Sequence, residues 1–346
     1  MDRMDQRTSI SRPPTLWERR SNTSFRRLTV LFAWLTIALV LYIFFEVGRA
    51  AQPALADQGL RFLVETTWDP NANDGAGQFG IFPQIWGTLY SSILALMLGS
   101  FFGISVAIFL SEGYLADFVF RLLKLFGVQF HPFWVNVPQR AEELLKNTVE
   151  LLAAIPSVVY GLWGIFVVIP LIRPGCNWVH EHLGWIPIFG TTLSGPGMLP
   201  AALVLAIMIL PTVSAISRDA LVSVPSRLRE ASYGLGATRW ETIFAVILPT
   251  AASGIFGSII LAFGRALGET MALAMLVGNA NQVSLSLFSP ANTLAALLAN
   301  SFPERDEKTE PFLMYAALVL MVTTLLVNVL GAWVVERATG HAKQNR

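Results

Sequence analysis

Residues 223–249, "SVPSRLREASYGLGATRWETIFAVILP", have the pattern of two short helices joined by a glycine turn. Ser223 or Ser226 is placed to cap the first helix, because a serine oxygen accepts a hydrogen bond from a free amide at a helix start. Gly234 and Gly236 are placed to end it, since glycine adopts the left-handed conformation of many helix C-termini. The segment therefore predicts an ordered helix pair between two apolar stretches.

The second helix of this pair has a start pattern of its own. Thr238 is followed three residues later by Glu241, which is the capping-box spacing, and the helix is expected to run to Pro249. A connector that only joined two apolar stretches would need no caps, so we expect the pair to dock against a protein surface. The exposed residues expected to make that contact are Arg227, Arg229, Arg239 and Trp240.

Apolar stretches occur along the whole chain. Of its 346 residues, 54% are hydrophobic and 14% are charged. A helix needs about 20 apolar residues to cross a bilayer, and only helices and closed barrels satisfy their backbone hydrogen bonds in lipid. The sequence therefore predicts an all-α integral membrane protein with six transmembrane helices. The predicted spans cover about 28–46, 86–110, 147–172, 198–217, 250–278 and 312–335.

The first span shares some features with a secretory signal peptide. Arg26 and Arg27 precede it, and Ala54-Leu55-Ala56 resembles a cleavage site. Its apolar run of roughly 19 residues is longer than the 7 to 15 of a signal-peptide core, so we expect a retained membrane anchor.

Lysine and arginine are unevenly distributed between the loops. Most of the 24 fall in the N-terminal tail, in 111–146, in 218–248 and after Val335. Because cytoplasmic loops are enriched in basic residues, both termini are expected in the cytoplasm. The expected parts are a cytoplasmic tail over 1–27, a first anchor with its external loop over 28–85, a core of five helices over 86–336 that contains the cytoplasmic loop 218–249, and a cytoplasmic tail over 337–346.

The external loops offer few groups for chemistry, and their tryptophans are expected to anchor the protein at the membrane interface. His180 and His182 lie two residues apart with no third ligand nearby, so we expect them to be solvated rather than to hold a metal. Cys176 is the only cysteine and cannot form an internal disulfide. A short interfacial helix is predicted over 291–301 and a solvated loop over 303–310.

Two charged residues interrupt the fifth predicted span. Arg265 lies 16 residues after Pro249, hence roughly 24 Å along the helix, and Glu269 would follow one turn further on the same face. Each charge costs about 2.5 to 3.5 kcal/mol at a bilayer centre, whereas an exposed ion pair of this spacing returns only about 0.2 to 0.5 kcal/mol. Pairing alone therefore explains them poorly. A structural ion pair between packed helices and a hydrated substrate path remain the two alternatives.

Side-chain chemistry favours an oxyanion on such a path, because a guanidinium donates two hydrogen bonds at once to a tetrahedral oxyanion. A glutamate beside it keeps binding weak enough for release. Phosphate near neutral pH carries a proton and sulfate carries none, so the Glu269 carboxylate is a hypothetical selector between them. The neighbouring small residues, which let a helix or a hydrated path approach the backbone, are Gly257, Ser258, Ala262, Gly264, Ala266 and Gly268.

The helix pair resembles the cytoplasmic motif of permease subunits in ATP-binding-cassette (ABC) importers. That motif is E-A-A, three residues, G, nine residues, I, one residue, L-P, and this chain keeps the spacing. Two positions depart from it, Ser232 for alanine and Val246 for isoleucine. The resemblance implies the type I ABC importer permease fold and a coupling loop that sits in a cleft of an ATPase subunit. The coupling-loop residues that it implies are Arg229, Glu230, Ala231, Gly236, Arg239, Leu248 and Pro249.

Two further stretches narrow the resemblance. "GRALGETMA" at 264–272 and "VELLAAIPSVVYGLWG" at 149–164 resemble the PstC family, one of the two permease types of the phosphate ABC importer. This implies a multi-pass protein of the bacterial plasma (inner) membrane. It also implies a PstA-like second permease, a PstB-like ATPase dimer and a PstS-like external phosphate-binding protein as partners. The implied substrate-path residues are Arg265, Glu269 and Thr270, whereas residues 127–138 match no family pattern.

ATP chemistry is not expected in this chain, because no G-x-x-x-x-G-K-[ST] loop occurs in it. ATP and Mg²⁺ are expected in the partner ATPase, while this chain is expected to contact membrane lipid and to bind no cofactor, metal or nucleic acid. Two alternatives remain open. An ABC permease for another anion or an amino acid would keep the coupling loop, whereas an ion-coupled secondary transporter with Glu269 as proton carrier would need no ATPase.

Overall fold

The computed structural model of the chain describes residues 15–72, 77–114 and 137–344. Residues 1–14 of the predicted tail and 127–136 of the unassigned segment lie outside this part. Within it, six helical segments are long and apolar enough to cross a membrane, which confirms the predicted all-α class and the number of spans. These segments are Leu16–Gln58, Phe82–Ser111, Ser157–Leu183, Met198–Val222, Arg239–Leu267 and Glu310–Arg337.

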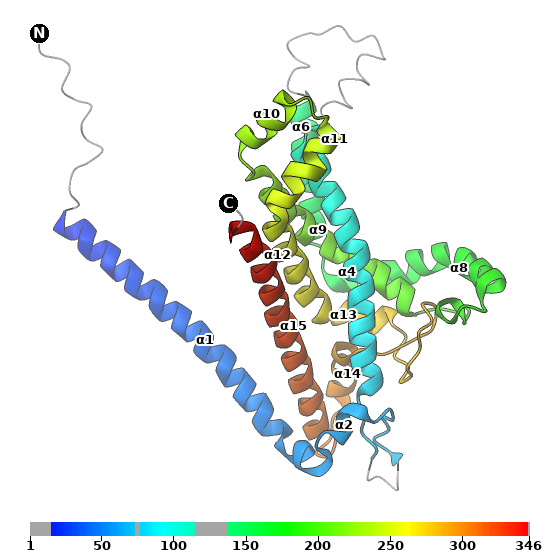
Figure 1. Cartoon of the computed structure of the whole chain (residues 1–346). Helices are drawn as coiled ribbons and strands as arrows, with labels where there is room; N and C mark the ends of the chain where they lie inside the picture. Colours follow the sequence, from blue (N-terminus) through cyan, green and yellow to red (C-terminus); the bar gives the residue numbers. More distant parts are fainter. Residues whose placement is uncertain (1–14, 73–76, 115–136, 345–346) are drawn as a thin grey trace, which may run out of the picture.

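Three long helices form the centre of the bundle (Figure 1): α4 (Phe82–Ser111), α9 (Met198–Val222) and α12 (Leu248–Leu267). The buried hydroxyls of Ser217 and Ser258 hydrogen-bond to each other at 2.8 Å and join α9 to α12. A fully buried polar pair of this kind is satisfied only when the two helices keep their register.

Glycines set the distance between α4 and α9. A Cβ on Gly99 would lie 2.7 Å from Ile209 Cγ1, and one on Gly103 would lie 2.8 Å from Val213 Cβ. Both distances are shorter than van der Waals contact, so only glycine allows the two helices to approach this closely. Hence α4 and α9 pack as one unit.

Helix α1 (Leu16–Gln58) leans away from the bundle and meets α15 (Glu310–Gln344) at one end only (Figure 1). Ala54 is buried at this contact, and the Tyr315 hydroxyl donates to the Gly59 carbonyl at 3.0 Å. The remainder of α1 is exposed in the isolated chain, and the mean hydropathy of its most apolar window is 2.5. This surface is suited to lipid.

The predicted boundary of the third span, 147–172, is wrong. The chain forms a separate helix α6 (Val137–Leu152), turns, and begins the span after Pro156 with α7 (Ser157–Trp163). The span ends with α8 (Ile169–Leu183), so part of the predicted external loop is helical. Proline disfavours helix in the residue before it and has no amide to donate, which separates α6 from α7. The apolar residues of α6 had merged with the span because hydropathy does not detect such a break.

The fifth span is also displaced from its predicted range, 250–278. It begins at the coupling loop with Arg239, ends at Leu267, and is followed by a break and the short helix α13 (Met271–Leu276). Gly268 occupies the C-cap of α12, where a residue without a side chain ends a helix readily. The break places Glu269 outside α12, so its predicted position on the same helical face as Arg265 is wrong.

Several spans continue through a proline, among them α1 at Pro53 and α9 at Pro211, and in two others the proline lies just after a π-helical turn. The turns are Gly164–Val168 and Ile243–Ile247, and the amides of Ile169 and Leu248 each donate to a carbonyl five residues back. A proline has no amide, so a wider turn before it lets the helix continue with fewer unsatisfied groups. The two prolines that follow the π turns are Pro170 and Pro249.

The segment before the last span contains α14 (Leu294–Ser301), capped by Thr293, whose hydroxyl accepts from the Ala296 amide at 3.2 Å. The predicted helix is therefore present, and its apolar residues Leu294, Ala295, Ala296 and Leu297 are buried against the rest of the protein. The following loop is exposed, as predicted. In it the Thr309 hydroxyl and amide donate to Asp306, which lowers the pKa of that carboxyl below its ordinary value. Other short elements are α2 (Arg61–Val64) and the 3₁₀ turns Pro187–Phe189 and Phe302–Glu304.

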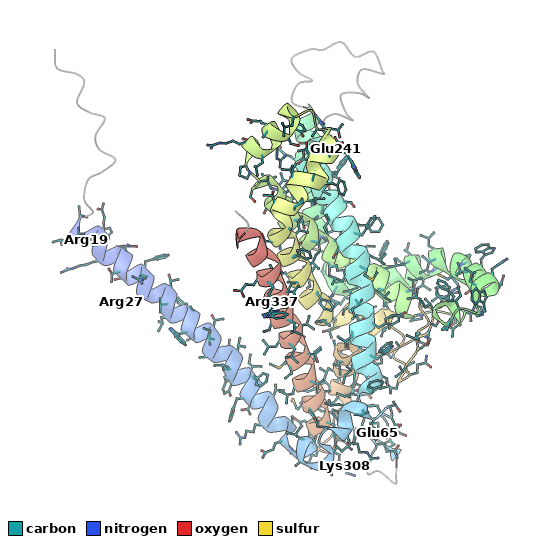
Figure 2. The ribbon with its side chains drawn as sticks, viewed as in Figure 1. Arg19, Arg27, Glu65, Glu241, Lys308 and Arg337 are labelled. Carbon is teal, nitrogen blue, oxygen red and sulfur yellow. The ribbon has the colours of Figure 1, made fainter. Side chains whose placement is uncertain are left out.

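Glu241 lies at one end of the molecule, and Glu65 and Lys308 lie at the opposite end (Figure 2). Arg19, at the start of α1, lies nearer the end that carries Glu241. The apolar lengths of the spans lie between these ends, as in a protein that crosses a bilayer.

Candidate functional site

The predicted helix pair is present as α10 (Ser226–Gly234) and α11 (Arg239–Thr242). The capping box is confirmed, because the Thr238 amide donates to Glu241 Oε2 at 2.7 Å and the Glu241 amide donates to Thr238 Oγ1 at 3.3 Å. The predicted serine cap of the first helix is wrong. Pro225 occupies that position with no side-chain cap, and its ring fixes φ at −55°, a value that suits a helix start.

The turn between α10 and α11 presents apolar side chains to solvent. Leu235 is 90% exposed, and Gly236 follows it with φ of +87°, a left-handed conformation that favours glycine. Trp240 is 66% exposed, and its ring lies 4.0 Å from that of Phe244. Large exposed apolar groups on an ordered loop are typical of a protein-binding surface. Other exposed residues of the pair are Arg227, Glu230, Ala231, Tyr233 and Arg239.

Arg229 does not belong to this exposed set, so its predicted exposure is wrong. Its Nη1 donates to Glu112 Oε1 at 2.8 Å, and its Nη2 donates to the Leu221 carbonyl at 2.8 Å. Glu112 lies 117 residues away in the sequence, which is why the local pattern around Arg229 gives no indication of it.

The two departures from the family motif, Ser232 and Val246, both lie in ordered parts of the helix pair and the turn that follows it. The Ser232 hydroxyl is buried and hydrogen-bonds the Thr242 hydroxyl at 2.8 Å, so it joins α10 to α11. Val246 lies within the π turn, between the buried Ile243 and Ile247 that pack on α9 and α12. At position 232, where the family motif has alanine, the serine therefore contributes a hydrogen bond between the two helices.

Arg265 lies in the last turn of α12 and is exposed in the isolated chain. Its Nη1 donates to Thr212 Oγ1 of α9 at 3.4 Å. A positive charge near the C-terminus of a helix is favoured by the helix dipole. That gain is too small to balance the cost of a guanidinium facing lipid, so this face requires cover by water or by another subunit.

Glu269 and Thr270 lie in the break between α12 and α13. Glu269 Oε1 accepts from the Ala272 amide at 3.4 Å, and the Thr270 hydroxyl donates to the Gly268 carbonyl at 3.1 Å. Among the described residues, the ion pairs within 4.0 Å do not include Arg265 with Glu269. The two charges thus lie at adjoining ends of two helices without direct pairing, and the break exposes backbone groups at the same level of the bundle.

The small residues around Arg265 divide into two groups. Gly264 packs against Asn328 of α15, since a Cβ there would lie 2.7 Å from Asn328 Oδ1. Gly257 has open space around it, and Gly268 meets only its own helix backbone at 3.8 Å. Gly264 therefore allows α12 to pack closely against α15, whereas Gly257 and Gly268 lie on the face of α12 that no other part of the described chain covers.

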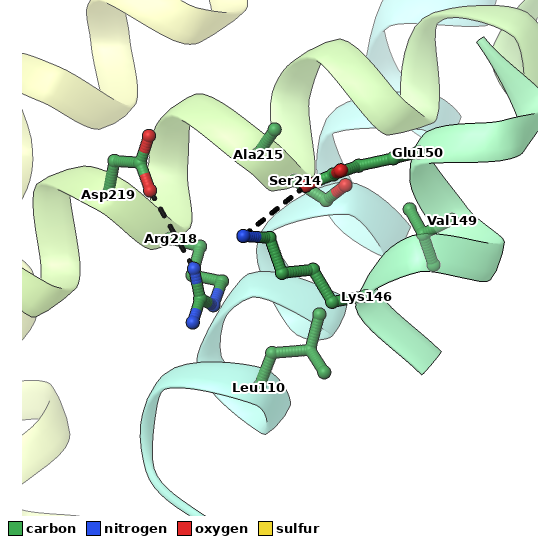
Figure 3. Close-up of a pocket in the computed structure, with 8 residues that line it drawn as sticks. All are labelled: Leu110, Lys146, Val149, Glu150, Ser214, Ala215, Arg218 and Asp219. Atoms are coloured by element: carbon green, nitrogen blue, oxygen red, sulfur yellow. Dashed lines mark ion pairs between the residues drawn. The ribbon is translucent and has the colours of Figure 1, made fainter. Parts of the chain in front are cut away.

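A pocket between α6, α9 and the end of α4 was not predicted, because α6 had been merged with a span (Figure 3). Lys146 lies 3.6 Å from Glu150, and Arg218 lies 3.8 Å from Asp219, so each base has a carboxylate nearby. The adjoining hollow, about 250 Å³, is also lined by Glu142 and Glu143. Carboxylates outnumber bases here, so the pocket is poorly suited to an anion.

The histidines form hydrogen bonds to the backbone. His180 Nδ1 lies 2.7 Å from the Phe189 carbonyl, and His182 Nδ1 lies 2.8 Å from that of Trp178. His180 is half-buried, which differs from the predicted solvated position. In the described part of the chain, no group of three or more His, Cys, Asp or Glu residues has an arrangement that could hold a metal ion.

Comparison with known families agrees with this architecture. The family model described as "binding-protein-dependent transport system inner membrane component" matches residues 126–340. The chain belongs to this family. The match includes the coupling loop, the fifth span and the break after it, so the helix pair and Arg265 lie within the part that defines these transport components.

Among its relatives within the family are PstC phosphate transport permeases. The phosphate transport system permease protein PstC of Haemophilus influenzae is 36% identical over 318 residues, covering 90% of this chain and 92% of that protein. PstC of Xylella fastidiosa strain Temecula1 is 35% identical over 308 residues, covering 88% and 86%. The family member described here is therefore a PstC-type permease and a multi-pass inner membrane component.

Solved structures of ABC importers share the fold of this family member. A chain of a bacterial ABC transporter involved in the import of alginate has a TM-score of 0.53 at 14% identity, covering 92% of this chain and 99% of that one. A chain of the MetNI methionine ABC transporter in an inward-facing conformation has a TM-score of 0.51 at 18% identity, covering 75% and 95%. At such identities the likeness concerns the fold alone.

Proposed function

We propose that this chain forms, together with a second permease, the membrane path of an ATP-driven importer of inorganic phosphate. The similarity to PstC permeases over most of both sequences supports the substrate class. The single observation that carries the assignment of the path is Arg265, a guanidinium within an apolar span that the chain itself leaves uncovered.

The chemistry of Arg265 suits this role. A guanidinium has five N–H donors, and the described contacts occupy one of them, the hydrogen bond to Thr212. Lipid would leave the others unsatisfied at a cost of several kcal/mol, whereas water, a partner subunit or a passing oxyanion would satisfy them. Phosphate matches the planar fork with two oxygens at once.

Glu269 and Thr270 complete the proposed path. Glu269 would accept a hydrogen bond from a protonated phosphate oxygen and weaken the attraction of Arg265 enough for release. The Thr270 hydroxyl, now bonded to the Gly268 carbonyl, would supply a neutral polar group in the same break. The position of both residues between two helix ends supports this, because their backbone neighbours are already free of regular helical bonding.

The coupling loop would dock on a separate ATPase dimer of PstB type, which binds ATP and Mg²⁺. The motif residues Glu230, Ala231 and Gly236 and the exposed Leu235 and Trp240 support such docking. Arg239, Leu248 and Pro249 would act with them, Pro249 by lying where the loop continues into α12 without interruption. A PstA-like permease and a PstS-like external binding protein would complete the importer, and this chain itself would bind no cofactor.

Both termini would lie in the cytoplasm. The basic residues in the loops that carry the coupling helices and at the start of α1 support this orientation. The parts would then be a cytoplasmic tail (1–27), a first anchor and external loop (28–85), a permease core (86–336) with the cytoplasmic loop 218–249, and a C-terminal tail (337–346).

The test replaces Arg265 in the complete importer, reconstituted in proteoliposomes with ATP and external binding protein. Arg265→Gln is expected to lower uptake of radiolabelled phosphate about 100-fold or more, because two charge-assisted hydrogen bonds to the substrate are lost. The matched control is Arg61→Gln, which removes an exposed arginine whose partner is Glu65 at 3.0 Å. Normal uptake by the Arg265 variant would rule out this residue as part of the path.

A further inference from the structure

Arg229 links three elements at the coupling-loop end of the molecule. It lies on α10, its Nη1 donates to Glu112 at the C-cap of α4, and its Nη2 donates to the Leu221 carbonyl in the last turn of α9. Both contacts measure 2.8 Å, which is the length of a strong charge-assisted hydrogen bond. One guanidinium therefore holds α10 against the ends of α4 and α9, two of the three helices that form the centre of the bundle.

The ion pair is shielded from water. The side chain of Glu112 is 6% exposed and that of Arg229 is 21% exposed. The other described ion pairs have partners that are 28% to 80% exposed, so they are screened and easily broken. A shielded pair has a narrow range of favourable geometries, because a displaced partner leaves an unpaired charge in a region of low dielectric.

Apolar packing surrounds the same junction. Ala107 of α4, Leu221 of α9 and Val224 of the loop belong to one buried cluster with Ile243 and Ile247 of the π turn. Within the loop, the hydrogen bond between the Ser232 and Thr242 hydroxyls joins α10 to α11. The loop thus lies against α4 and α9 as a packed body rather than as a flexible connector.

Helix α9 extends this junction to the candidate path. Leu221 and Thr212 lie on the same uninterrupted helix, nine residues or roughly 14 Å apart. Thr212 accepts the hydrogen bond from Arg265. A displacement of α10 that moves α9 would therefore reach the level of Arg265 through rigid elements.

We infer that the Arg229–Glu112 pair is the positioning contact that makes the coupling loop, α4 and α9 move together when the ATPase moves the loop. This rests on the proposed docking of the loop. Without the pair, the loop can still dock and respond to ATP. However, α10 then shifts relative to the ends of α4 and α9, so less of the motion of the loop reaches these two helices. ATP hydrolysis then continues while the path opens less often.

The experiment measures phosphate imported per ATP hydrolysed, in proteoliposomes that contain the complete importer. Arg229→Gln is expected to retain the ATPase subunits on purification. It is expected to lower the phosphate-to-ATP ratio roughly tenfold, which is within the usual size of energetic coupling between two sites of a protein. The ratio does not depend on how much importer folds, so a loss of stability alone leaves it unchanged. Arg61→Gln, which breaks an exposed arginine–glutamate pair far from the loop, is expected to leave it at the wild-type value.

A second variant covers the case in which Arg229→Gln leaves too little assembled importer, since Glu112 would be buried without its partner. The double variant Glu112→Gln with Arg229→Gln contains no buried unpaired charge and is expected to assemble, yet to keep the low ratio. A wild-type ratio in the double variant, or in an assembled Arg229→Gln, overturns the inference.

The same measurement separates this inference from the proposed function. If the ATPase subunits do not bind this chain at all in the wild-type importer, the proposed docking fails. If they bind and hydrolyse ATP, and the ratio is insensitive to Arg229, only the positioning role fails.

Discussion

The coupling loop and the break at Arg265 differ in how completely this chain satisfies their polar groups. In the loop, Thr238 and Glu241 cap each other, Ser232 has Thr242, and Arg229 has two partners. At the break, Arg265 has one long hydrogen bond and an exposed side chain, and Glu269 accepts a single contact of 3.4 Å. The loop is complete within the chain, whereas the break has polar groups that only water, substrate or another subunit can satisfy.

This contrast indicates which mutations act through structure and which act through transport. Changes inside the loop should alter its stability, its attachment to the ATPase or the coupling of ATP hydrolysis to import, whereas changes at the break should alter flux and leave the assembly intact. The four predictions below test that division.

Among these four predictions, the largest effect is expected on the exposed face of the loop. Leu235→Asp should weaken binding of the ATPase subunits roughly 30-fold in Kd, the effect of losing a central apolar contact and placing a charge there. Co-purification and titration of the ATPase onto the permease in nanodiscs measure it. The control is Leu60→Asp, because Leu60 is 75% exposed and lies outside the coupling loop. Unchanged affinity in the Leu235 variant would show that this residue faces no partner.

A smaller effect is expected at the break from Arg265→Lys. Lysine keeps the charge but cannot donate two parallel hydrogen bonds, so phosphate uptake should fall about tenfold while ATPase binding stays normal. If Arg265→Lys instead caused the ATPase subunits to dissociate from the permease, the proposed division between the loop and the break would be wrong.

The next effect concerns selection rather than rate. Glu269→Gln should change the ratio of phosphate to sulfate flux about fivefold toward sulfate, since a neutral amide no longer repels an unprotonated oxyanion. The measurement needs an importer variant that works without its external binding protein, because that protein selects substrate first. Equal ratios in the variant and its parent would discard Glu269 as a selector.

The smallest effect is expected at the loop cap. Thr238→Ala removes the hydroxyl that accepts from the Glu241 amide, so hydrogen exchange of that amide should accelerate about twofold or more. Phosphate uptake should change little. Thr148→Ala is the control, since Thr148 bonds a carbonyl of its own helix rather than a free amide. Exchange that is equally slow in both variants would mean that the capping box adds nothing to the order of the loop.

The sequence predicted features that depend on neighbouring residues. Runs of apolar residues gave the number of spans, and the three-residue spacing of Thr238 and Glu241 gave the capping box. It failed where two elements join without a change in hydropathy. The turn before Pro156 and the break after Leu267 both lie inside apolar runs, so the third and fifth spans were placed too early and too late.

The amino-acid sequence by itself determined a six-span membrane permease with an ordered helix pair between two spans and two costly charges near one another. These follow from hydropathy, local caps and motif spacing, which act over a few residues. Only the tertiary structure decided that Arg229 turns inward to Glu112 and that Arg265 contacts Thr212 rather than Glu269. Such partners come from distant parts of the chain, and packing of α4, α9 and α12 sets their distances, which no local pattern encodes.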